Sequence, residues 1–107
     1  AKHCPPGGEY ELGGHPIEIR DNGLAYLKGT DTIAGSTLHI NRGLRLLVEE
    51  ALVPFDAALN ACTINPARCL RVDDHKGRLA AGYDADLVVL EDNYDVCQTY
   101  CKGVAML

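Results

Sequence analysis

Four consecutive branched apolar residues, Leu-Val-Val-Leu at 87–90, constrain the fold of this chain more than any other feature. Successive side chains of a β-strand point to opposite faces of its sheet, so this run is apolar on both faces. A strand of that kind needs cover on both faces. Glycine turns at Gly77 and Gly82 precede it, followed by an acidic corner at Asp84 and Asp86. The stretch therefore predicts a strand that enters a packed sheet.

The acidic corner has two interpretations. Two neighbouring carboxylates can work as a general acid and a general base in hydrolysis. An Asp side chain at a corner can instead accept hydrogen bonds from backbone N–H groups and so fix a turn. Because Asp84 and Asp86 stand immediately before the predicted strand, we favour turn chemistry.

Length and charge exclude several classes of protein. A chain of 107 residues supports one small domain but not a complete (β/α)₈ barrel, which takes about 250 residues. The formal net charge of −5 argues against nucleic acid or an anionic membrane as a partner. No apolar run approaches the roughly 18 residues of a spanning helix, and no signal-peptide pattern opens the chain.

Five cysteines need an explanation, and none pairs with another at the two-residue spacing of a zinc knuckle. They are Cys4, Cys62, Cys69, Cys97 and Cys101. We expect free thiols packed as small apolar groups, with a structural metal site or a disulfide as the alternative. Free thiols fit a reducing cytoplasm, which is the location that we expect.

Short strands are predicted at both ends of the chain. Near the start, alternating residues at 10–12, 17–19 and 24–27 predict a small meander, with turns at 13–14 and 21–23. Near the end, strands are predicted at 87–90, 96–101 and 104–107.

Three helices are predicted between these two groups of strands. The first is capped by Ser36 or Thr37, the second begins at Pro54, and the third has Asn65 as its N-cap and Pro66 in its first position. Apolar side chains repeat at helical spacing: Leu44, Leu47, Val48 and Ala51 in the first helix, and Phe55, Ala58, Leu59 and Cys62 in the second.

Residues that could perform chemistry are sparse. A hydrolytic metal site needs several convergent ligands, but His3, His15, His39 and His75 are scattered, so we expect surface or loop histidines. The stretch 32–36, Thr-Ile-Ala-Gly-Ser, remains as a candidate, because glycine lets a ligand approach the backbone and a following helix N-terminus favours oxygen-rich ligands. A plain strand-to-helix connection is the alternative that the residues alone favour.

Several segments carry a resemblance to a known family. The stretch 77–90 resembles the sheet-entry motif of the amidohydrolase superfamily, G-x-L-x-x-G-x-x-A-D-L-V-V-L. Residues 32–38 and 43–49 are similar to the N-acetylglucosamine-6-phosphate deacetylase family within it. Residues 8–14 and 63–68 match the same family, so the likeness runs in order along nearly the whole chain. Ile40, Gly43 and Leu46 depart from the pattern, where the family usually has Met, Ala and Asn.

The resemblance implies an α+β fragment. Residues 1–76 would be the C-terminal end of an amidohydrolase TIM barrel, made of a strand meander plus helices. Residues 77–107 would be the C-terminal strands of the small β-sandwich domain.

The resemblance also implies the chemistry of a parent enzyme. It would hydrolyse the acetamide of N-acetylglucosamine 6-phosphate to glucosamine 6-phosphate and acetate, using a water on a divalent metal such as zinc and an Asp that moves the proton. That Asp is expected just before Ala1 and the metal ligands further upstream. We therefore expect no catalytic and no metal-binding residue in this chain, which alone would be inactive. Ile33, Ala34 and Gly35 carry over as part of the sugar site.

Two other functions stay open. Another amidohydrolase, such as a relative of dihydroorotase or hydantoinase, would share the motif at 77–90 but would not explain residues 32–36. A non-catalytic binding or assembly module would fold as a monomer with its apolar faces covered. For a deacetylase segment we expect a homo-oligomer, because its helices and strands would present apolar faces and open edges.

Overall fold

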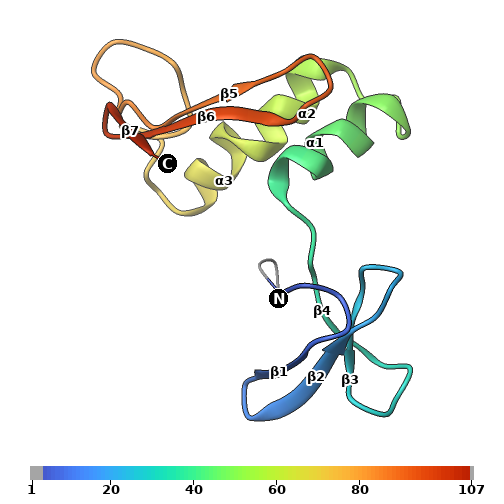
Figure 1. Ribbon diagram of the computed structural model, residues 1–107. Helices are drawn as coiled ribbons and strands as arrows, with labels where there is room; N and C mark the ends of the chain where they lie inside the picture. The colour runs from blue at the N-terminus through green and yellow to red at the C-terminus, as the bar shows by residue number, and fades with distance from the viewer. Residues whose placement is uncertain (1–3, 107) are drawn as a thin grey trace. The chain divides into compact units, whose positions relative to one another are not determined.

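The computed structural model describes residues 4–106 and divides them into two compact units, one up to residue 39 and one from residue 40 on (Figure 1). Neither contains a helix that is long and apolar enough to cross a bilayer, within the part of the chain that the structure describes.

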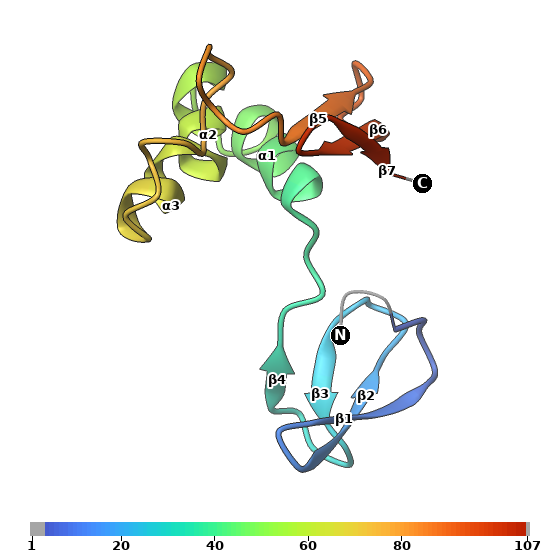
Figure 2. The same ribbon diagram turned by 90° about the vertical axis from the view of Figure 1, so that its left-hand side faces the viewer.

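The first unit is a four-stranded antiparallel sheet in the order of the sequence (Figure 2). Its strands are β1 (Glu9–Leu12), β2 (His15–Ile19), β3 (Ala25–Leu27) and β4 (Ile33–Gly35). The three predicted strands of the meander are confirmed. Gly13 and Gly14 join β1 to β2 with φ of 58° and 82°, the left-handed backbone that a two-residue hairpin turn requires. Ile17, Ile19 and Ala25 form the buried core of this unit.

The strand β4 was not predicted, since a connection was expected at 32–36. In the structure Ile33 pairs with Tyr26, and Gly35 pairs with Ala25. Three residues of β4 thus lie opposite two of β3, so Ala34 is the extra residue of a β-bulge. The small residues made this stretch look like a loop, whereas the long-range pairing with β3 makes it the edge strand of the sheet.

The second unit contains three helices and a three-stranded antiparallel sheet. The helices are α1 (Ile40–Glu49), α2 (Phe55–Cys62) and α3 (Ile64–Cys69), and each packs against the next. The strands are β5 (Leu87–Leu90), β6 (Val96–Cys101) and β7 (Val104–Met106), paired in that order. The side-chain amide of Asn41 in α1 donates to the carbonyl oxygen of Tyr94, and so ties α1 to the turn between β5 and β6.

The helices are confirmed, but two predicted N-caps are wrong. The hydroxyl of Ser36 accepts a hydrogen bond from the Leu38 amide, and the hydroxyl of Thr37 donates to the Gly23 carbonyl. Both side chains are therefore used before α1, which begins at Ile40.

The N-cap predicted for the third helix is also wrong. Helix α3 begins at Ile64, so Asn65 lies inside it and Pro66 is its third residue. Proline is tolerated anywhere in a first turn, because the first N–H groups of a helix have no intrahelical partner. A proline therefore marks the start of a helix only to within one turn.

The apolar run at 87–90 forms the predicted strand but lacks the predicted cover. Val88 and Val89 are 56% and 46% exposed, and Leu87 and Leu90 are half-buried. Within residues 4–106, no element covers both faces of β5. The observed class is an α+β chain with two antiparallel sheets; the assignment to a barrel end and a sandwich, and the domain boundary at residue 76, stay predictions.

Candidate functional site

The candidate segment Ile33–Gly35 lies on the edge strand β4. Ile33 is 60% exposed, whereas Ala34 is half-buried and packs against the core of the first unit. A Cβ added to Gly35 would lie 3.5 Å from the Leu12 side chain, which is an ordinary contact, and Gly35 has no positive φ. The segment therefore presents the Ile33 side chain and a strand edge free of bulk at Gly35.

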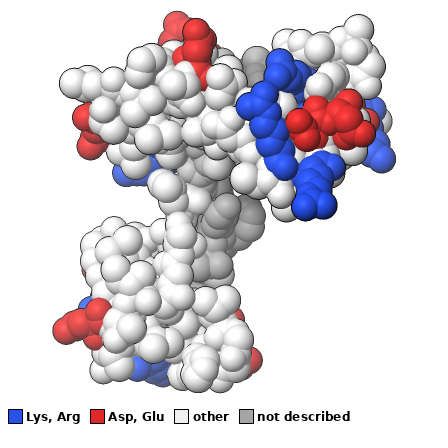
Figure 3. Space-filling model, turned by 180° about the vertical axis from the view of Figure 1, so that it is seen from behind, with Lys and Arg blue, Asp and Glu red and all other residues white. Residues whose placement is uncertain are grey.

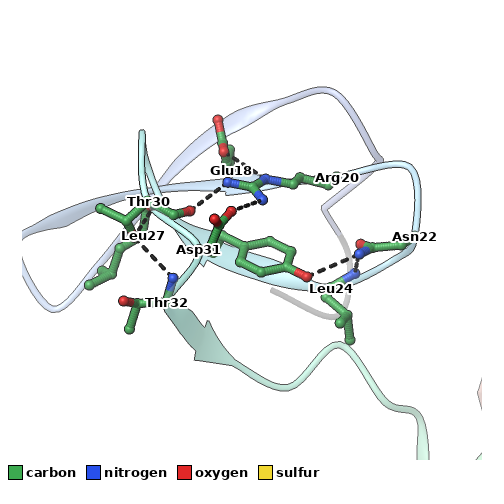
Figure 4. Close-up of polar contacts among 9 residues, drawn as sticks. Glu18, Arg20, Asn22, Leu24, Leu27, Thr30, Asp31 and Thr32 are labelled. Atoms are coloured by element: carbon green, nitrogen blue, oxygen red, sulfur yellow. Dashed lines mark hydrogen bonds and ion pairs between the residues drawn. The ribbon is translucent and has the colours of Figure 1, made fainter.

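A tight turn holds the chain just before this segment (Figure 4). The Leu27 amide donates to the Thr32 carbonyl at 2.9 Å, and the Thr30 amide donates to the Leu27 carbonyl at 3.0 Å. The Thr30 hydroxyl donates to the same Leu27 carbonyl and accepts a hydrogen bond from the Thr32 amide. Both the carbonyl and the amide of Thr32, the residue before β4, are therefore hydrogen-bonded.

Arg20 joins this turn to β2. Its guanidinium contacts Glu18 at 2.9 Å and Asp31 at 2.8 Å, and lies 4.0 Å from the centre of the Tyr26 ring. Hydrogen bonds to Asp31 and then to Glu18 raise the pKa of Arg20 above its ordinary value. This cluster was not predicted from the sequence, because Arg20 lies just after the predicted strand at 17–19 and its partner Asp31 is 11 residues away along the chain.

A second cluster of charges lies in the other unit. The ammonium of Lys76 donates to Asp84 at 2.8 Å and to Asp86 at 2.6 Å. These ion pairs lower the pKa of both carboxyls and raise the pKa of Lys76. The other oxygen of Asp86 accepts a hydrogen bond from the Lys102 amide, which confirms turn chemistry for Asp86.

Acidic and basic side chains lie next to one another on the second unit (Figure 3). Two carboxylates bridged by one ammonium are held in the charged form, and this does not suit them to exchange protons near neutral pH. The Lys76 cluster therefore stabilises a corner, and this role of Lys76 was not predicted from the sequence.

The described residues offer no metal centre. Among residues 4–106, no group of three His, Cys, Asp or Glu side chains is placed to hold a metal ion. His75 lies 2.6 Å from Asp74 and lowers the pKa of that carboxyl, while His15 and His39 are exposed. His3 lies outside the described residues. The five cysteines are free thiols, and partial burial raises the pKa of Cys62.

The order of elements and the motif at 77–90 define the class of protein. Residues 16–106 match the model of the amidohydrolase family, and the chain belongs to that family. Its described residues do not supply the metal site on which such enzymes generally depend.

Closer relatives are N-acetylglucosamine-6-phosphate deacetylases. The chain is 38% identical over 99 residues to the deacetylase of Danio rerio, covering 92% of this chain and 24% of the relative. A crystal structure of the Mycobacterium smegmatis deacetylase matches 99% of this chain and 28% of its own, at 35% identity and a TM-score of 0.82. A mutant of that enzyme in complex with N-acetyl-D-glucosamine-6-phosphate matches 92% of this chain and 26% of its own, at 40% identity and a TM-score of 0.77. The chain therefore spans about a quarter of the length of these relatives.

Proposed function

We propose that this chain is the C-terminal segment of an N-acetylglucosamine-6-phosphate deacetylase. The parent enzyme hydrolyses the acetamide of N-acetylglucosamine 6-phosphate to glucosamine 6-phosphate and acetate. One observation carries the proposal: the likeness to these deacetylases covers nine-tenths or more of the chain in both sequence and structure.

Within the parent enzyme, the stretch Ile33–Gly35 of this chain positions the sugar. Ile33 offers an exposed apolar side chain, and Gly35 leaves the backbone accessible. Because β4 is the last strand of its sheet, one side of its backbone has no strand partner among the described residues. Free N–H and C=O groups of that kind can bind hydroxyl or amide groups of a sugar. The divalent metal and the group that moves the proton come from other parts of the parent enzyme.

A chimera tests the proposal. Residues 4–106 of this chain replace the matching segment of the Mycobacterium smegmatis relative; we call this protein the chimera. We expect it to release acetate from N-acetylglucosamine 6-phosphate within about tenfold of the unmodified relative, because only positioning residues are exchanged. A chimera that folds, as judged by circular dichroism and thermal unfolding, yet releases no acetate would contradict the proposal and favour a non-catalytic module.

The isolated chain is the complementary test. We expect no acetate release from it, even with added zinc, because its described residues do not converge on a metal. Acetate release by the pure chain would contradict the proposal that the metal and the proton-transferring group come from other parts of the parent enzyme.

A further inference from the structure

All three nitrogens of the Arg20 guanidinium donate hydrogen bonds within the first unit (Figure 4). Its Nε donates to Glu18, one terminal nitrogen donates to Asp31, and the other donates to the backbone carbonyl of Thr30. The flat face of the same group lies over the Tyr26 ring at 4.0 Å. A planar fork that donates in three directions while stacking is a geometry that lysine cannot reproduce.

These contacts converge on Ile33 from two sides. Thr30 and Asp31 belong to the turn that leads directly into β4. Tyr26 is the residue that pairs with Ile33 across β3 and β4. The Arg20 side chain, which directly follows β2, therefore contacts both the turn before the candidate segment and the residue that pairs with Ile33 in the sheet.

The arrangement differs from an ordinary surface ion pair. Arg45 pairs with Glu49 one turn away on α1, and exposed pairs of this kind contribute little that can be measured. Arg20 instead binds a backbone carbonyl 10 residues away, so its loss removes a restraint on the backbone of the turn and not merely a contact with a neighbouring side chain. The bulge at Ala34 gives β4 an irregular pairing, and an outside restraint matters most in such a strand.

We propose that Arg20 is a positioning residue, which fixes Ile33–Gly35 for the ligand through the turn at 30–32 and through Tyr26. The identity of the ligand rests on the proposed function, and it is N-acetylglucosamine 6-phosphate. Arg20 acts through the segment and does not touch the reacting atoms.

The kinetic test uses the chimera with Arg20→Lys and Arg20→Gln, and with Arg45→Gln as the matched control. We expect KM to rise about 5- to 20-fold in both Arg20 variants while kcat changes less than about threefold, because ground-state placement is lost but the reacting groups are intact. Arg20→Lys should not rescue KM although it keeps the charge. Asp31→Asn removes one exposed partner, carries little risk to folding, and should raise KM about two- to threefold.

A second measurement does not depend on activity. Amide hydrogen exchange at Ile33 and Gly35 in the 107-residue chain should be at least about tenfold faster in Arg20→Gln than in Arg45→Gln. Unchanged exchange would overturn the proposal. Faster exchange with unchanged KM would also overturn it, since Arg20 would then hold the turn without serving the ligand. If the unsubstituted chimera folds but is inactive, the proposed function fails together with the named ligand, and exchange alone then decides whether Arg20 positions the segment.

Discussion

Gly77 shows how one residue connects the sequence motif to the packing of the second unit. Its φ is +86°, and a Cβ at this position would lie 2.9 Å from the Ile64 Cα and 3.0 Å from the Ala67 Cβ. Glycine is therefore required twice, for its backbone conformation and for the close contact with α3. Only the turn was predicted from the sequence, because contact with Ile64 and Ala67, ten or more residues away, leaves no local signal.

Replacing Gly77 with Ala tests this double requirement, with Gly82→Ala as a matched control. Gly82 has a φ of +87° but nothing within 4 Å of the added Cβ. We expect Gly77→Ala to lower the free energy of unfolding by about 3–4 kcal/mol and Gly82→Ala by about 1–2 kcal/mol, since only the first adds overpacking to backbone strain. Urea denaturation of the chain measures both. Equal losses would show that the contact with α3 is unimportant.

Lys76 makes stability depend on pH through its two carboxylate partners. The lowered pKa of Asp84 and of Asp86 stabilises the fold above the ordinary carboxyl pKa of about 4, and this contribution is lost as the pH falls through the lowered values. The raised pKa of Lys76 stabilises the fold below the ordinary lysine pKa of about 10.4, and is lost at higher pH. The cluster therefore works between about pH 5 and pH 10.

A variant Lys76→Met should have a lower Tm than the unmodified chain at pH 7, because it leaves two neighbouring carboxylates without a counter-charge. Thermal unfolding across the pH range should show this difference shrinking as the pH falls below about 4 and through the lowered pKa of the two carboxyls. Lys28→Met, which removes a single more exposed pair with Glu9, is the control and should lower the Tm less. A difference in Tm that does not shrink between pH 7 and pH 2.5 would contradict the electrostatic explanation.

At the scale of elements, the periodic spacing of apolar residues predicted strands and helices better than individual capping residues predicted where a helix starts. The strands of the meander and the helices were predictable because apolar residues repeat at the period of each structure. The start of α1 was not, since Ser36 and Thr37 satisfy other backbone groups. The strand β4 and the hold of Arg20 on its turn were not predictable either, because both depend on pairing between β3 and β4.

The strand β4 also carries the prediction about the sugar site, tested by Gly35→Val with Gly35→Ala as its control. The fold accepts one added carbon at Gly35, because the nearest atom is 3.5 Å away. Valine adds two further methyl groups on the strand where we place the sugar. In the chimera we expect KM to rise about tenfold for Val but less than about threefold for Ala, with kcat falling only if the sugar is mispositioned. Unchanged kinetics in Gly35→Val would remove this segment from the site.

At the scale of the whole molecule, the buried apolar side chains of residues 4–106 are few, and three of the seven are alanines. They are Ile17, Ile19, Ala25, Leu44, Ala58, Ile64 and Ala67. The apolar stripe of α2 that the sequence predicted is only partly covered, with Phe55 48% and Leu59 37% exposed. The helical spacing shows which side chains are apolar, but it carries no information on what packs against them.

We therefore expect the isolated chain to self-associate. β5 and β7 are the outer strands of their sheet, and both expose apolar side chains: Val88 is 56% and Val104 is 65% exposed. Strand edges with apolar side chains pair readily with other chains, whereas an edge lysine opposes pairing. Light scattering should give a mass above 11.5 kDa that increases with concentration. Val88→Lys and Val104→Lys should lower that mass more than Leu79→Lys, which adds the same charge to an exposed loop residue. A mass that stays at 11.5 kDa as the protein concentration is raised would contradict this and favour a non-catalytic module that folds as a monomer.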